Sequence, residues 1–352
     1  MIRLIPKWIF LAVFLVSLGV KPSHARQITT AQKMVAANPV SHDLLVGAEQ
    51  FDRYIPMLKG KRVGLLVNQT SRAFDQHLVD ALLDKGVQIS TIFAPEHGFR
   101  GDKAAGEKFD KEFDAKTGLP IYSLYASHKR PDQQQLKNVD ILIFDIQDVG
   151  VRFYTFISSM HYLMQSCAEF SVPLIVLDRP NPNGDYVDGP LLDTRFSSFL
   201  GIHPIPMVHG LTVGELANMI EGESWLQLKF KALSNQVSDA VSKTHKVSDL
   251  HCDLRVIPVK NYRHDRRYSL PIKPSTNLPN DLSVRLYPSL ALFEATDVSV
   301  GRGTPWPFQV LGYPDSKMGD FSFVPNAIGG SWKSLNHAET ETLWRKNSAC
   351  TS

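Results

Sequence analysis

Four apolar runs in the first half of the chain are each followed directly by a cluster of polar, turn-forming residues. The runs are RVGLLV, ISTIF, DILIF and PLIVL, at residues 62–67, 89–93, 140–144 and 173–177. Short runs rich in Val, Ile and Leu are typical of strands in a parallel sheet that is covered on both faces. The polar residues follow the strand every time, which indicates one repeated arrangement and not four unrelated turns.

Segments with helical periodicity separate these runs. Residues 77–85 place Leu78, Val79, Leu82 and Leu83 on one face, and residues 156–170 carry apolar side chains at three- and four-residue steps. The alternation predicts an α/β fold with a doubly wound, mainly parallel sheet at residues 44–200. Right-handed crossovers place the carboxyl ends of the strands on one edge, where ligands bind in such sheets. The four polar clusters should therefore meet around one crevice.

The second half of the chain has a different character. Pro and Gly become denser after about residue 200, and we expect residues 201–325 to form a smaller α+β domain that faces the crevice like a lid. It should contain a helix from Thr212 and a helical run through residues 289–295. The stretch Thr212-Val213-Gly214-Glu215 is typical of a capping box. We therefore assign Glu215 to the start of that helix and not to a functional site.

The first 25 residues are typical of a secretory signal peptide, with a short basic start, an apolar run from Trp8 to Val20 and the small-x-small site Ser23-His24-Ala25. We expect cleavage after Ala25, a periplasmic or secreted protein, and an irregular lead-in at residues 26–43. The peptide contains three of the 38 basic residues and no acidic one, so 35 basic residues remain against 35 acidic ones. This balance argues against nucleic acid as a partner and against stable membrane association.

Cysteine and histidine spacing does not indicate a metal site. The three cysteines, Cys167, Cys252 and Cys350, lack the C-x-x-C pattern, and His97 lacks the H-E-x-x-H spacing. Export makes a disulfide possible, although three cysteines imply no disulfide framework. Cys167 lies among apolar helix positions and is expected to be a small buried side chain.

Long motifs in a fixed order make the chain resemble the exo-β-N-acetylmuramidases, which release N-acetylmuramic acid from the non-reducing end of peptidoglycan fragments. The motifs include VNQTS, APEHGFRG, FDIQDVGVRFYT, LDRPNPNG, PMVHGLTVGELA and SVGRGTPWPFQVLGYP, between about Leu45 and Pro325. The resemblance implies a Rossmann-like amino-terminal domain, a smaller carboxyl-terminal domain and an active site between them. It also implies no metal or other cofactor, and a catalytic glutamate in the EHG motif, which is Glu96 here.

The chemistry of glycoside hydrolysis is consistent with a catalytic role for Glu96. The reaction usually needs one carboxylic acid to protonate the leaving oxygen and a second carboxylate as base or nucleophile. Glu96 suits the acid role if the cleft raises its pKa. For the second carboxylate we favour Asp148 over Asp145, which ends its strand, with Asp178 as a third candidate. Assistance by the substrate's N-acetyl group would remove the need for a second carboxylate, and retention or inversion stays open.

The remaining candidates are binding residues. The lactyl carboxylate of N-acetylmuramic acid suits a bidentate arginine, for which Arg152, Arg179 and Arg302 are candidates. Hydroxyl and amide contacts are assigned to the other polar residues of the loops, namely Asn68, His97, Asp145, Gln147, Tyr154, Asp178, Asn181 and His209. Two of these candidates have a purely structural role as the alternative. Residues 179–182 would then form only a rigid turn, and Arg302 would be only a structural partner for another residue.

Two other functions remain in view. A periplasmic protein that binds muramyl sugars without turnover would use Glu96 as a hydrogen-bond acceptor. An esterase or deacylase is disfavoured because the chain has no G-x-S-x-G elbow. The sequence does not predict the oligomeric state.

The segment 326–352 loses both apolar periodicity and the resemblance, whereas the related proteins continue. We expect that the reading frame is truncated or shifted after about residue 325. The second domain would then be incomplete, and apolar faces of residues 255–310 would be left partly uncovered.

Overall fold

A computed structural model describes residues 44–95, 98–100, 110–125, 128–227, 250–313 and 322–325. The strands are β1 (Val63–Val67), β2 (Arg72–Ala73), β3 (Gln76–His77), β4 (Ile89–Ala94), β5 (Lys111–Phe113), β6 (Pro120–Ser123), β7 (Ile141–Asp145), β8 (Leu174–Leu177) and β9 (Leu254–Ile257). Seven of them form one sheet in the order β5-β6-β4-β1-β7-β8-β9, and β2 pairs with β3. All neighbours in the large sheet are parallel except β5 and β6.

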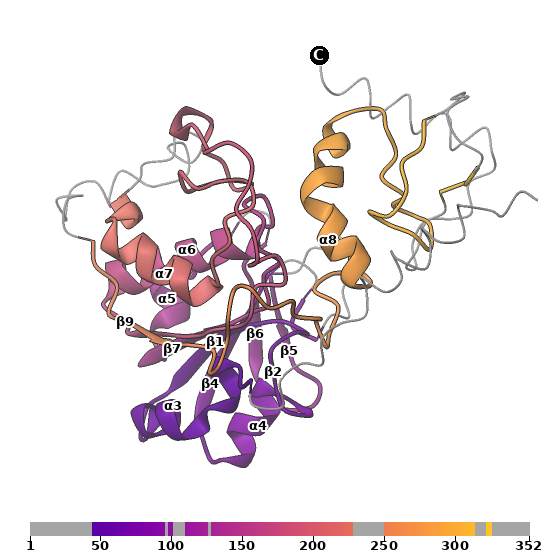
Figure 1. Cartoon of the computed structure of the whole chain (residues 1–352). Coiled ribbons are helices and arrows are strands. Elements are labelled where there is room, and N and C mark those ends of the chain that lie inside the picture. Colours follow the sequence, from indigo (N-terminus) through magenta and orange to yellow (C-terminus); the bar gives the residue numbers. More distant parts are fainter. Residues whose placement is uncertain are drawn as a thin grey trace, which may run out of the picture. The chain divides into compact units, whose positions relative to one another are not determined.

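Helices cover both faces of this sheet. The helices of the described residues are α3 (Phe51–Leu58), α4 (Leu78–Asp84), α5 (Gln133–Leu136), α6 (Phe156–Phe170), α7 (Val213–Gly222) and α8 (Asp281–Leu290), with short 3-10 helices at Gly47–Glu49, Thr194–Phe196, Trp225–Gln227 and Ala291–Ala295. In Figure 1, α3 and α4 lie on one side of the strands and α6 and α7 on the other. Leu65 packs in the core cluster with α3 and α4, and its neighbour Leu66 packs with α6 and α7. The predicted α/β fold with a doubly wound sheet is confirmed.

The strand order explains where a ligand can bind. From β1, the chain first builds outward through β4 to β6, and then builds the other way through β7, β8 and β9. The four strands predicted from apolar runs are β1, β4, β7 and β8, and every residue of β1, β7 and β8 is buried. The reversal between β1 and β7 is the point at which such sheets bind ligands, outside the carboxyl ends of the strands.

Helix starts follow local capping. Before α7, the Thr212 hydroxyl accepts a hydrogen bond from the Glu215 amide (3.2 Å), and the Glu215 carboxylate accepts one from the Thr212 amide (2.8 Å). The predicted capping box is therefore confirmed. Helix α8 begins earlier than predicted, because the Asn280 side chain accepts from the Ser283 amide (2.9 Å) and caps a helix whose interior includes Pro288.

The predicted boundary near residue 200 falls inside the sheet-forming part of the chain, because β9 at residues 254–257 is the last strand of the large sheet. A separate core cluster joins Val149 and Val151, after β7, to Val284 and Tyr287 of α8. The division into two domains, with a lid formed by the second, stays a prediction.

Three predicted segments lie outside the described residues: the signal peptide, the lead-in up to residue 43, and the tail from residue 326. Large apolar side chains are exposed at Leu282, Leu292, Trp306 and Leu311. The incomplete second domain itself stays a prediction. None of the helices in the described ranges is both long and apolar enough to span a membrane.

Candidate active site at the carboxyl ends of the strands

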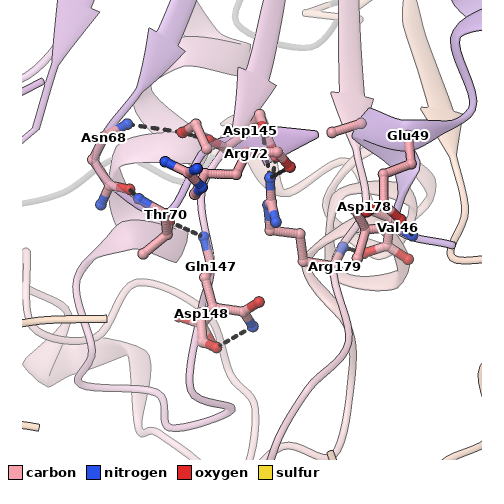
Figure 2. Close-up of polar contacts among 12 residues, drawn as sticks. Val46, Glu49, Asn68, Thr70, Arg72, Asp145, Gln147, Asp148, Asp178 and Arg179 are labelled. Atoms are coloured by element: carbon pink, nitrogen blue, oxygen red, sulfur yellow. Dashed lines mark hydrogen bonds and ion pairs between the residues drawn. The ribbon is translucent and has the colours of Figure 1, made fainter. Parts of the chain in front are cut away.

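The loops after β1, β7 and β8 meet at one edge of the sheet, because these strands are parallel neighbours. Figure 2 shows their polar residues together, with Asn68 after β1, Asp148 after β7, and Asp178 and Arg179 after β8. The predicted convergence is therefore present for three of the four clusters. The fourth follows β4, and its residues Glu96 and His97 lie outside the described residues.

Hydrogen bonds join the loops after β1 and β7. The Asn68 side-chain oxygen accepts from the amide and the hydroxyl of Thr70, at 2.9 and 2.6 Å. The Gln147 amide donates to the Thr70 hydroxyl (3.0 Å), and the Ser71 hydroxyl donates to the Asp145 carbonyl. Both loops are buried here, so these bonds hold Asn68 and Gln147 in fixed positions beside the reversal point.

A buried ion pair joins the loops after β7 and β8. The Arg179 guanidinium binds both carboxylate oxygens of Asp145, at 2.6 and 2.8 Å, and donates to the Arg72 carbonyl at 2.8 Å. Burial opposes the charge of Arg179, but the attraction of Asp145 and its hydrogen bonds outweigh burial and raise the pKa of Arg179. These contacts favour a structural role for Arg179 and Asp145 over a direct role in binding the lactyl group.

Asp178 also has its oxygens occupied by the protein. One oxygen accepts from the Arg179 and Gly214 amides, at 2.9 and 2.8 Å, and the other accepts from the Thr212 hydroxyl at 2.8 Å. Burial raises the pKa of Asp178 to about 6, although these three hydrogen bonds oppose the shift. A Cβ at position 214 would lie 2.7 Å from the Asp178 carboxyl carbon, so the start of α7 needs glycine there. Asp178 thus anchors the amino terminus of α7 to the end of β8.

Asp148 differs from the other two carboxylates. It is 3% exposed, and one oxygen accepts from the Gly150 amide at 2.6 Å and lies 3.7 Å from His209 Nε2. Its other oxygen has no hydrogen-bond partner within the part of the chain that the structure describes. His209 Nδ1 accepts from the Leu211 amide (3.2 Å), so the neutral ring carries its proton on Nε2, which faces Asp148. This pair is the most available acid–base group at the described part of the edge.

The residues that follow Glu96 and His97 are held in place. Phe99 is buried, and its ring lies 4.7 Å from that of His77 in an edge-to-face contact. His77 Nε2 in turn lies 2.9 Å from the Asn68 carbonyl oxygen, and burial lowers the pKa of His77 to about 4, which keeps the ring neutral. The chain after the EHG motif is therefore connected to the loop after β1.

Arg100 forms a second anchor, which sequence reasoning missed. Its guanidinium makes two hydrogen bonds of 2.9 Å to Asp114 and two of 3.3 Å to Asp80. The hydrogen bond from Arg100 lowers the pKa of Asp114 to about 2, so this carboxylate stays charged. Arg100 stands in the APEHGFRG motif, but its partners lie 14 and 20 positions away and leave no local pattern.

Several other predicted binding residues have protein partners. The Gln147 side chain donates to the carbonyls of Asp148 and Pro180, Asn181 donates to Leu211 and accepts from Asn183, and Arg152 donates to the carbonyls of Pro190 and Ile205. The Tyr154 ring packs against Phe156 and Tyr287, and Arg302 pairs with Glu294. Their predicted roles in sugar binding stay predictions.

A surface hollow of about 600 Å³ lies beside this edge, lined by Gln69, Arg72, His77, Asp80, Arg100 and Lys116 among others. None of the predicted site residues that the structure describes lines it, so this hollow is distinct from the Asp148 position. In the described ranges, no group of three or more His, Cys, Asp and Glu side chains is arranged to hold a metal ion.

A doubly wound sheet with buried carboxylates at its strand ends defines an α/β protein with a polar site at the carboxyl edge. Comparison with known proteins then gives the family: the chain belongs to the exo-beta-N-acetylmuramidase NamZ family. The family's N-terminal model matches residues 63–282 and its C-terminal model matches residues 285–325.

Individual relatives agree with this family. The peptidoglycan beta-N-acetylmuramidase NamZ of Bacillus subtilis (strain 168) is 39% identical over 282 residues, which are 78% of this chain and 62% of that protein. The chain thus spans less than two thirds of that relative's length. Two crystal structures of DUF1343 family proteins from Bacteroides fragilis NCTC 9343 are similar. One has a TM-score of 0.70 at 44% identity over 86% of this chain and 80% of its own. The other has a TM-score of 0.64 at 32% identity over 76% of this chain and 65% of its own.

Replacing Arg179 should expose the cost of an unpaired buried charge. We expect Arg179→Met to lower the free energy of unfolding by about 3–5 kcal/mol, because Asp145 loses its partner, and the double variant with Asp145→Leu to recover much of the loss. Arg195→Met, which breaks the exposed pair with Asp193, should change it by less than about 0.5 kcal/mol. Urea unfolding measures all three. Equal losses in the two single variants would contradict a structural role for the buried pair.

Gly150→Ala should strain the loop that carries Asp148. Gly150 has φ +76°, and a Cβ there would lie 2.2 Å from the Asn181 side-chain oxygen. Gly118 is a matched control, because its φ is +70° but no atom lies within 4 Å of an added Cβ. We expect Gly150→Ala to lose about 1–3 kcal/mol more than Gly118→Ala in urea unfolding. Similar losses of stability in the two variants would contradict this, because they would show that Asn181 moves away from the added methyl group without cost.

Asp178 predicts a pH dependence of stability. Its pKa is about 6 in the folded chain against an ordinary value of 3.8, so between these pH values the folded chain holds a proton that the unfolded chain has lost. The stabilisation is therefore complete below pH 3.8 and is lost as pH rises through about 6. Relative to Asp178→Asn, the wild type should lose up to about 3 kcal/mol between pH 4 and pH 7.5. A constant difference between the two proteins in urea unfolding would refute this assignment.

Proposed function

We propose that this protein is a glycoside hydrolase that releases N-acetylmuramic acid from the non-reducing end of peptidoglycan fragments, with Glu96 as the general acid. Membership of the NamZ family over residues 63–325 supports this function, and the site supports it independently. The observation that carries the proposal is the convergence of the loops after β1, β7 and β8, with the buried Asp148 at their meeting point.

Asp148 is the proposed second carboxylate. An ionised carboxylate acts as base or nucleophile, and it needs an oxygen that is not committed to the protein. Asp145 and Asp178 have both oxygens engaged, whereas Asp148 keeps one oxygen without a partner among the described residues. His209 Nε2 lies 3.7 Å from the other oxygen of Asp148.

The anchors beside the EHG motif support the role of Glu96. A general acid acts only when its proton is held close to the leaving oxygen, and small displacements cost large factors in rate. Phe99 packs on His77, and Arg100 binds Asp114 and Asp80, so the chain immediately after the motif is fixed to the rest of the fold.

This function places the protein outside the cytoplasm, where peptidoglycan lies, and the predicted signal peptide agrees with export. The alternative function is binding of muramyl sugars without turnover. In that case Glu96 would accept a hydrogen bond from the sugar and would not donate a proton to it.

Two substrates with different leaving groups test the acid role. We expect Glu96→Gln to lower kcat on a disaccharide of N-acetylmuramic acid and N-acetylglucosamine by roughly 10²–10⁴-fold, and to lower kcat on a nitrophenyl N-acetylmuramide much less, because a phenolate leaves without protonation. Asp148→Asn should impair both substrates similarly. Release of N-acetylmuramic acid, followed by chromatography, is the measurement.

Glu223→Gln, on the exposed residue that follows α7, is the control and should leave both activities unchanged. Full disaccharide turnover by Glu96→Gln would remove Glu96 from the acid role. Calorimetric binding of the disaccharide by a wild-type protein that releases no product would favour the binding function instead.

A further inference from the structure

Two buried cysteines lie in the same core cluster between the sheet and its helices. Cys167 lies near the end of α6 and Cys252 lies two residues before β9. Their side chains are 1% and 5% exposed, and both belong to the core cluster that contains α6 and α7. Both thiols are free in the structure, and Cys252 adds to the effect of burial in raising the pKa of the Cys167 thiol.

The backbone independently holds the two cysteines together. The Val172 amide donates to the Cys167 carbonyl at 3.0 Å, and the Leu174 amide donates to the carbonyl of Asp253, the neighbour of Cys252, at 2.9 Å. One short segment thus binds both cysteine-bearing segments, and the register of β8 and β9 continues from this point. The backbone of the sheet and α6 therefore brings the two cysteine-bearing segments to the same short segment.

We propose that Cys167 and Cys252 form a structural disulfide when the chain folds under oxidising conditions. A thiolate of one cysteine attacks an oxidant disulfide and forms a mixed disulfide. The thiolate of the other cysteine then attacks this mixed disulfide and releases the second thiol of the oxidant. In this exchange the two cysteines lose two protons and two electrons and gain one S–S bond. The oxidant, a small-molecule or protein disulfide, takes up both electrons and both protons and leaves as two thiols.

Burial decides when this bond forms. Only the thiolate reacts, and burial raises the pKa of the Cys167 thiol, which is 1% exposed and out of reach of the oxidant in the folded core. The bond therefore forms before the core closes, and the folded protein keeps whichever redox state it had when it folded. Cytoplasmic and exported preparations of the same chain should differ in this bond.

The disulfide would reinforce the edge of the sheet. Strand β9 is the last strand of the described sheet and pairs there with β8 alone. A bond from α6 to Cys252, two residues before β9, closes a loop of roughly 85 residues, which restricts the unfolded chain strongly. We expect the oxidised protein to have a Tm higher than the reduced protein by roughly 5 °C or more.

Refolding in a glutathione buffer tests the proposal without reference to activity. The full chain is denatured and reduced, then refolded in oxidised and reduced glutathione, while a folded reduced sample is placed in the same buffer. Both are denatured and alkylated without reduction and analysed by mass and peptide mapping. The refolded sample should take up one label and yield a peptide pair linking Cys167 to Cys252, and the folded sample should take up three labels.

Variants give the control and the contradicting results. Cys350→Ala should keep the linked peptides and the higher Tm, and Cys252→Ala should lose both. Three labels in the refolded wild type, or a link that involves Cys350, would overturn the proposal. Rapid oxidation of the folded sample would overturn the claim that burial decides when the bond forms. If a variant does not fold, peptide mapping of the wild type alone decides whether Cys167 and Cys252 form the disulfide.

Discussion

The ion pair between Arg179 and Asp145 is the contact on which the candidate site depends. Burying two charges has a large desolvation cost, and such pairs often contribute little net stability. Its value here is positional, because Arg179 also binds the Arg72 carbonyl, and the Asp145 carbonyl accepts from Ser71. The loops after β1, β7 and β8 are thereby fixed to one another at the point where the winding of the sheet reverses.

Three carboxylates at this edge have the same chemistry and different environments. Asp145 is neutralised by Arg179, and Asp178 is bound by three donors at the start of α7. Only Asp148 keeps an oxygen without a partner in the described part of the chain, with His209 as its neighbour. The first two hold the loops, and the third is the one to which we assign the proposed chemistry. A sequence shows three similar aspartates, and only their partners distinguish these roles.

Local patterns predicted the parts of the fold that local forces build. The apolar runs located β1, β4, β7 and β8, and the side chains of Thr212 and Glu215 predicted the start of α7, because each signal lies within a few residues. Strands β5, β6 and β9 have three or four residues each, and their identity depends on partners distant in sequence. The same limit hid the pairings of Arg100 with Asp114 and of Arg179 with Asp145, since charge pairs leave no periodicity.

The anchors around the EHG motif suggest how the fold separates support from reaction. Arg100 and its partners carry charges that are fully paired, so they can fix the chain without changing protonation near neutral pH; the pKa of Asp114 at about 2 keeps that carboxylate ionised. Phe99 and the neutral His77 add an apolar contact that is equally insensitive to pH. An acid that must gain and lose a proton in each cycle is best supported by neighbours that do not. Hence the chain beside the EHG motif is supported by groups that keep their protonation state, and the proposed acid–base chemistry is left to Glu96 and Asp148.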